Sequence, residues 1–141
     1  MSDLIARASV SVGARVQKVW DALTTPETIK RYMFGTTVAS DWKEGGPITW
    51  KGEWQGRKYE DKGVVMQFKP PQLLQYTHFS PLAGLPDVPE NYHTVTIALS
   101  ADGNRTLVDL TQDHNDTEEA RAHSIKNWEM MLAGLKRVVE E

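Results

Sequence analysis

Two histidines stand where each could share a strand face with another polar side chain. His78 lies two residues after Tyr76, and His114 lies two residues after Gln112, both in segments that alternate like strands. Residues two apart in a strand point to the same side of the sheet, so each pair could orient the polar end of a ligand. Histidine could also act as an acid or a base near neutral pH. We expect hydrogen-bonded wall residues rather than acid–base groups.

Adjacent carboxylates, Glu60 and Asp61, offer a second kind of chemistry. A cyclase or a hydrolase needs a general base inside its cavity. Because neighbouring residues of a strand face opposite ways, one of the two carboxylates is expected to point to water. We therefore assign no catalytic residue from the sequence.

The remaining reactive residues form no pattern typical of a metal or cofactor site. The four histidines, at positions 78, 93, 114 and 123, share no short ligand spacing. The chain has no cysteine, which excludes disulfides, thiolate catalysis and cysteine-bound zinc. No nucleophile elbow accompanies a serine. The segment 43–47 is a turn without phosphate-binding spacing. We expect neither a metal nor a cofactor.

Composition favours a globular domain and argues against several function classes. The chain has 141 residues, of which 40% are hydrophobic and 25% charged, with a net charge of −3. This balance makes nucleic-acid binding improbable. No run approaches the roughly 18 apolar residues of a membrane span, and no secretory signal is visible. We expect one domain over residues 1–141, located in the cytoplasm.

The C-terminal segment predicts one long amphipathic helix from Thr117 to Glu141. Its apolar residues recur at spacings of three and four, the period of one helical face; they are Ala122, Ile125, Trp128, Leu132, Leu135 and Val139. Asp116 and Glu119 are spaced like a capping box. The helix would be about 33 Å long. We expect its apolar face to cover one face of a sheet.

The rest of the chain predicts one strand, two short helices and then six strands. Ile5–Val12 alternates as a strand, and Ala14–Leu23 has helical spacing. Thr25 and Pro26 suit the start of a second helix that ends at Gly35. The six expected strands are 36–41, 48–55, 58–68, 73–79, 93–100 and 106–114. Gly56 and Arg57 are a candidate hairpin turn, and 80–91 is expected to be a mobile loop at the mouth of a cavity.

This order predicts an α+β domain in which a curved antiparallel sheet surrounds the long helix. A cavity between helix and sheet would bind an apolar ligand, with Met33 and Phe34 as its gate. The candidate lining residues are Met33, Phe34, Trp50, Trp54, Tyr76, His78, Val95, Ile97, Val108, Leu110, Gln112, His114, Trp128, Met131 and Leu132. For Trp50 and Trp54, packing in the core without any ligand is an equally good interpretation.

Three stretches resemble one known family. They are Val16–Glu27 (VQKVWDALTTPE), the segment from Asp61 to Thr77 that contains DKGVV and PPQLLQYT, and Asn127–Lys136 (NWEMMLAGLK). Together they resemble the domains similar to the activator of Hsp90 ATPase (AHSA1-like), within the START-like helix-grip superfamily that also contains the Bet v 1 and polyketide-cyclase groups.

The resemblance implies the helix-grip fold, and three functions remain open. The first is binding of a small apolar or amphipathic ligand, such as a lipid or an aromatic metabolite. The second is a protein-interaction role with an Hsp90-type chaperone. The third is an enzyme of the polyketide-cyclase or hydrolase kind. Either a monomer or a homodimer fits each of these functions.

Overall fold

A computed structural model describes residues 4–81 and 84–141, apart from the side chain of Trp54. Its elements follow the predicted order: β1 (Leu4–Val12), α1 (Val16–Thr24), α2 (Pro26–Tyr32), β2 (Thr37–Ser40), β3 (Pro47–Trp54), β4 (Arg57–Lys69), β5 (Leu73–His78), η2 (Pro89–Asn91), β6 (His93–Asp102), β7 (Arg105–Asn115) and α3 (Glu118–Val139). The α+β fold class is confirmed.

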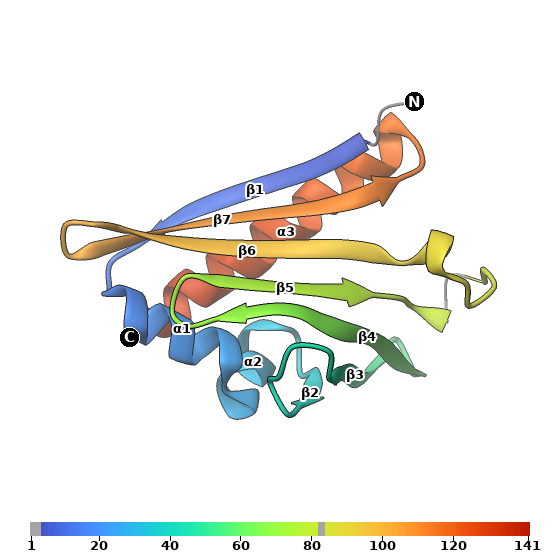
Figure 1. The fold of residues 1–141 in the computed structure, drawn as a ribbon, viewed down its shortest axis with the longest axis horizontal. Coiled ribbons are helices and arrows are strands. Elements are labelled where there is room, and N and C mark those ends of the chain that lie inside the picture. Colours follow the sequence, from blue (N-terminus) through green and yellow to red (C-terminus); the bar gives the residue numbers. More distant parts are fainter. Residues whose placement is uncertain (1–3, 82–83) are drawn as a thin grey trace.

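In the described part of the chain, seven strands form one antiparallel sheet in the order β1-β7-β6-β5-β4-β3-β2. The first strand therefore pairs with the last one, and the strands between them follow as successive hairpins. Figure 1 shows α3 crossing one face of this sheet, with α1 and α2 below the C-terminal end of the helix. This arrangement is the helix-grip fold that the resemblance implied.

The core lies under the C-terminal half of α3. Leu132, Leu135 and Val139 are buried there against apolar side chains of the sheet. Gly134 lets α2 approach closely, because an added Cβ atom would lie 3.2 Å from the Cβ atom of Tyr32. The hydroxyl of Tyr32 donates a hydrogen bond to the Ala22 carbonyl at 2.9 Å. The second half of the helix is thus fixed at close range to both helices and sheet.

The N-terminal half of α3 is less deeply buried than its apolar spacing predicts. Ala122 is exposed, and Ile125 and Trp128 are only half-buried. The reason is that this half of the helix borders a pocket, which Ser124, Asn127 and Trp128 line, instead of a packed core. The expected continuous buried stripe is therefore wrong for Ala122, Ile125 and Trp128.

Two turn details also differ from the sequence prediction. The helix cap is Thr117, whose hydroxyl accepts a hydrogen bond from the Ala120 amide at 3.0 Å; the predicted cap, Asp116, lies one residue too early. The β3–β4 hairpin turns at Gln55 and Gly56, both with positive φ, and not at Gly56 and Arg57. Two left-handed residues match the twist of a two-residue hairpin.

Candidate functional site

A pocket of about 490 Å³ lies between the sheet and the N-terminal half of α3. One wall is the helix itself, the rim includes the end of α2, and the inner faces of β3 to β7 form the floor. This volume falls within the usual range of small-molecule sites. The pocket lies toward one end of the helix.

Eight of the predicted lining residues border this pocket: Met33, Phe34, Trp50, Tyr76, His78, Gln112, Trp128 and Met131. Another group belongs to the packed core: Val95, Ile97, Val108, Leu110 and Leu132. Ile97 also borders a small void of about 30 Å³ that shares Met33, Trp50, Tyr76 and Met131 with the main pocket. The side chain of Trp54, which was predicted to point inward, is outside the described part of the structure.

His114 does not face the pocket, and the reason is a β-bulge. Ala6 pairs with Gln112, but Leu4 pairs with Asn115, so β7 contains one extra residue between the two pairs. His114 has a φ of 57° at this point and is exposed. A bulge reverses the alternation beyond it. Asn115 is consequently the buried residue, and it binds the Leu4 carbonyl at 2.9 Å.

The predicted lining did not include eight further residues of the pocket wall: Thr36, Glu53, Tyr59, Asp61, Ser80, His93, Ser124 and Asn127. Of these, only Asp61 was considered from the sequence as a cavity residue, as one of two possible general bases. Some of them carried a usable signal. On β4, the buried Val65 and Gly63 fix the inner side, and the period of two then places Asp61 and Tyr59 on the same side. The helical residues Ser124 and Asn127 are polar and gave no such signal, because polar helix faces normally meet solvent.

Asp61 and His78 form a hydrogen-bonded pair in the wall. Asp61 Oδ2 lies 2.9 Å from His78 Nε2. The other carboxylate oxygen, Oδ1, is buried and has no hydrogen-bond partner among the described residues. A buried polar atom without a partner is uncommon and calls for an explanation. We therefore regard this pair as the chemically most distinctive part of the pocket.

Gly63 is what brings the two strands of this pair together. A Cβ atom at position 63 would lie 1.7 Å from the carbonyl oxygen of Thr77, so only glycine permits this approach. Two backbone hydrogen bonds between Lys62 and Phe79, at 3.0 and 2.8 Å, extend the pairing of β4 with the end of β5. The close contact brings Asp61 within reach of His78.

Aromatic rings surround the pair. The ring of Trp50 lies 5.0 Å from that of His78, edge to face, and 5.1 Å from that of Tyr76. Burial raises the pKa of the Tyr76 hydroxyl, which keeps that group protonated, and therefore a hydrogen-bond donor, at neutral pH.

A second polar group lies against the helix. The indole Nε1 of Trp128 donates to Gln112 Oε1 at 2.5 Å, which satisfies the oxygen of a nearly buried amide. His93 Nδ1 donates to the Asp113 carbonyl at 2.9 Å. Both contacts fix the orientation of a side chain that borders the pocket.

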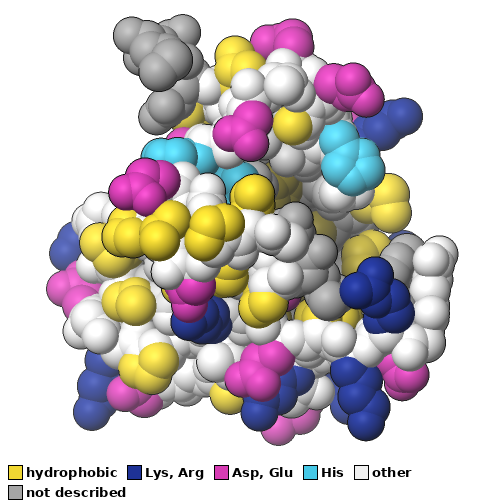
Figure 2. Space-filling view, turned by 90° about the vertical axis from the view of Figure 1, so that its right-hand side faces the viewer, with side chains coloured by type: hydrophobic (Ala, Val, Ile, Leu, Met, Phe, Trp, Pro, Cys, Tyr) yellow, Lys and Arg dark blue, Asp and Glu magenta, His cyan; other side chains and the backbone are white. Residues whose placement is uncertain are grey.

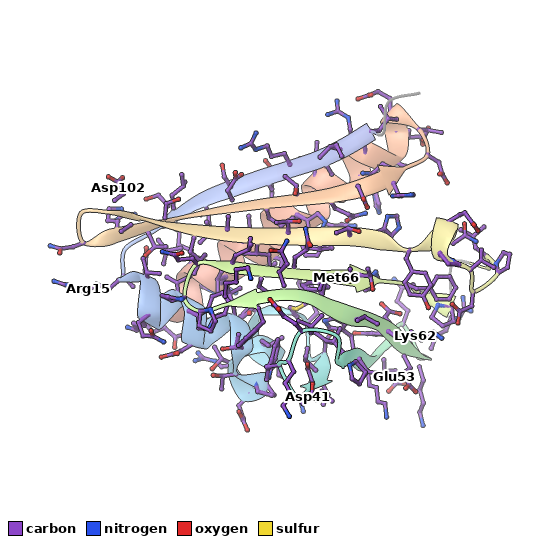
Figure 3. All side chains as sticks on the ribbon, in the orientation of Figure 1. Arg15, Asp41, Glu53, Lys62, Met66 and Asp102 are labelled. Atoms are coloured by element: carbon purple, nitrogen blue, oxygen red, sulfur yellow. The ribbon has the colours of Figure 1, made fainter. Side chains whose placement is uncertain are left out.

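The charged side chains of the described pocket wall are acidic. The lining includes the carboxylates of Glu53 and Asp61 but neither lysine nor arginine. Across the described residues, no cluster of three or more histidine, aspartate or glutamate side chains could hold a metal ion. Figure 3 places Glu53 and Lys62 at one end of the sheet, opposite Arg15 and Asp102 at the far end.

Figure 2 looks onto the end of the molecule that carries the β5–β6 connection and the start of α3. Hydrophobic and histidine side chains lie side by side on this face, and lysine and arginine side chains lie mostly toward its edges. Within the described ranges, no helix is long and apolar enough to cross a membrane.

Comparison with solved structures supports the fold assignment. The solution structure of ChR145 from Cytophaga hutchinsonii is 57% identical, with a TM-score of 0.87, over 99% of this chain and 97% of that one. CalU16 from Micromonospora echinospora is 23% identical, with a TM-score of 0.72, over 98% of this chain and 85% of that one. The Aha1 dimer from Colwellia psychrerythraea is 21% identical, with a TM-score of 0.73, over 96% of both chains. The last two show the fold alone.

The search of curated proteins returned no significant match. The family model described as activator of Hsp90 ATPase homolog 1-like protein matches residues 13–140. That match covers α1, the sheet from β2 onward and the whole of α3. The chain therefore belongs to the family of proteins like the activator of Hsp90 ATPase homolog 1.

Proposed function

We propose that this protein binds a small amphipathic ligand in the pocket between α3 and the sheet. The single observation behind this proposal is a pocket of about 490 Å³ whose wall combines aromatic rings with a few fixed polar groups. Sites for small molecules usually have this composition. Burial of the ligand would supply the affinity, at about 25 cal/mol per Å² of apolar surface removed from water.

The polar wall groups favour a ligand with one polar end. Its apolar body would lie against Trp50, Trp128 and Met131, which border the pocket. Its polar end would meet His78 or Gln112. The absence of basic residues from the described wall makes a carboxylate or phosphate head group a poor fit, because a buried anion needs a positive partner.

Titration with the neutral dye Nile red tests the proposal. We expect saturable fluorescence enhancement in the wild-type protein. Asn127 borders the pocket, so Asn127→Trp should fill it and weaken binding at least about tenfold, which corresponds to about 1.4 kcal/mol. Lys126→Trp places the same ring on an exposed neighbouring position and should leave binding unchanged. Equal affinity of the two variants, or no saturable binding, would reject the proposal.

Family membership supports a second candidate, a contact with an Hsp90-type chaperone. The observation behind it is the family match over residues 13–140. Its test is the ATPase rate of a bacterial Hsp90 with saturating amounts of this protein. Stimulation that persists in Asn127→Trp would assign the contact to a surface separate from the pocket. An unchanged ATPase rate would reject this candidate.

A further inference from the structure

We propose that Asp61 and His78 form a proton-transfer pair, with His78 as a general base toward a carbon-bound hydrogen of an aromatic carbonyl compound. The inference rests on the ligand-binding function proposed above and adds a reaction to it. It explains why a hydrogen-bonded histidine–carboxylate pair lies in the pocket wall.

The geometry sets the roles of the two side chains. With 2.9 Å between them, Asp61 Oδ2 accepts the hydrogen of His78 Nε2. This bond selects the tautomer whose Nδ1 atom carries a lone pair. No described group hydrogen-bonds Nδ1, and the His78 side chain borders the pocket. His78 is therefore the catalytic residue of the proposal, and Asp61 is a positioning residue that also stabilises an imidazolium.

The unpaired oxygen of Asp61 is the second observation. Its Oδ1 atom is buried without a partner among the described residues, and the side chain of Asp61 is only 16% exposed. Leaving a buried acceptor unmatched costs free energy. Because this unpaired oxygen does not stabilise the fold, a role of the carboxylate in a reaction explains its position beside His78.

Neighbouring groups suit a flat substrate whose oxygen becomes negative. Trp50 lies about equally close to Tyr76 and His78, so an aromatic ligand against Trp50 would be near both. Tyr76 lies on the same face of β5 as His78, because the two residues are two positions apart. Its hydroxyl has no hydrogen-bond partner among the described residues, and it can donate to a developing oxyanion.

The proposed step is balanced without a cofactor. His78 Nδ1 removes the hydrogen as a proton from the carbon next to a carbonyl group. The electron pair of that C–H bond forms a C=C bond, and the carbonyl π electrons move onto oxygen, where Tyr76 donates a hydrogen bond. The imidazolium then returns the proton to the enolate, at oxygen or at a conjugated carbon. The net reaction is an isomerisation.

Nitrobenzisoxazole is the probe for this step. It is a neutral, flat aromatic compound; a base removes its ring hydrogen, the N–O bond breaks, and a coloured nitrophenolate forms. We expect saturable turnover in the wild-type protein. His78→Gln should lower kcat by at least about a hundredfold, the lower end of the usual effect of a general base. His114→Gln is the matched control, because His114 also contacts a carboxylate, that of Asp113 at 3.1 Å, but is exposed outside the pocket.

Two further measurements separate catalysis from folding. Free imidazole should restore turnover to His78→Ala, an effect that a purely structural histidine would not show. Asp61→Asn should lower kcat while leaving KM nearly unchanged, because the amide reverses the hydrogen bond to the ring. Circular dichroism reports whether each variant is folded.

The outcomes distinguish the two proposals. Wild-type turnover equal to that of His78→Gln would overturn the proton-transfer pair. If the probe still quenched tryptophan fluorescence in a saturable manner, the ligand-binding proposal would stand. If neither the probe nor Nile red bound, both proposals would fall.

Discussion

Trp128 and Gln112 show how one side-chain contact joins the helix to the sheet. The indole donates to the amide oxygen at 2.5 Å, and the amide is nearly buried. We expect Trp128→Phe to cost about 1–3 kcal/mol of unfolding free energy, because it keeps an aromatic ring but leaves a buried acceptor unpaired. Urea unfolding measures this loss.

A double-mutant cycle gives the control. Gln112→Leu removes the acceptor, so Trp128→Phe should cost much less in that background. If the two changes are simply additive, the hydrogen bond contributes nothing to stability.

Gly63 should tolerate no side chain. Its added Cβ atom would lie 1.7 Å from the Thr77 carbonyl oxygen, so Gly63→Ala must push β4 away from β5. We expect a loss of about 1–3 kcal/mol in unfolding free energy, typical of overpacking. Met66→Ala is the matched control on the same strand, because Met66 is half-exposed, and it should change stability by less than about 0.5 kcal/mol. An equal effect of the two substitutions would contradict the close approach.

At this scale the sequence predicts a residue's side reliably only where alternation is unbroken. On β5 the alternation is unbroken, and Tyr76 and His78 both border the pocket. On β7 the same rule holds as far as Gln112 and fails at His114, where an extra residue with positive φ reverses it. Nothing in the local residue types distinguishes that bulge from a regular strand. The contact between Asp61 and His78 depends on strand pairing, and the sequence alone did not reveal it.

The start of α3 offers a prediction about an element. Thr117 caps the helix through its side chain, so Thr117→Ala should cost about 1 kcal/mol. Asp116→Ala should cost less, because Asp116 lies before the cap. Thermal or urea unfolding of the two variants decides between them. A larger effect at Asp116 would favour the capping box expected from the sequence.

The two halves of α3 perform different tasks. The second half packs in the core as its apolar period predicts, with Leu132 and Leu135 almost completely buried. The first half carries Ser124, Asn127 and Trp128 over the pocket. Periodicity identifies a face that avoids water, but it cannot tell whether that face meets a packed sheet or a cavity. That distinction depends on the separation of helix and sheet, which is set by the whole fold.

For the whole molecule, the order and types of the elements were predictable from the sequence. Alternation and turn residues give the strands, and hairpin connections between successive strands lead to the sheet order from β2 to β7. The pairing of β1 with β7 is non-local, and neither alternation nor turn residues indicate it. The volume of the pocket could not be predicted, because it is the small difference between the space enclosed by the fold and the volume of its side chains.

Four carboxylates have a lowered pKa because they accept hydrogen bonds from other parts of the chain; they are Glu44, Asp87, Glu140 and Glu141. Hydrogen bonds from the Phe68 amide and Lys69 lower the pKa of Glu44, and those from Lys62 and Tyr92 lower that of Asp87. The hydrogen bonds from Lys136 and the Gly13 amide lower the pKa of Glu140, and the hydrogen bond from Arg31 lowers that of Glu141. These contacts fix a turn, a loop and the end of α3.

These lowered pKa values predict a loss of stability in acid. A carboxyl group with a lower pKa in the folded state binds its proton more tightly when unfolded, so its stabilisation is present above the unfolded pKa of about 4 and disappears as the pH falls through the folded value. We expect the midpoint temperature of thermal unfolding to decrease once the pH is lowered below about 4. Glu140→Gln should weaken this dependence, because the amide keeps an acceptor for the Gly13 amide, 2.6 Å away, but cannot titrate. The exposed Glu129→Gln should leave the dependence unchanged.

Since the four groups are exposed, added salt should reduce the charge-dependent part of the effect. A midpoint that stays constant into acid would show that these contacts do not contribute to stability.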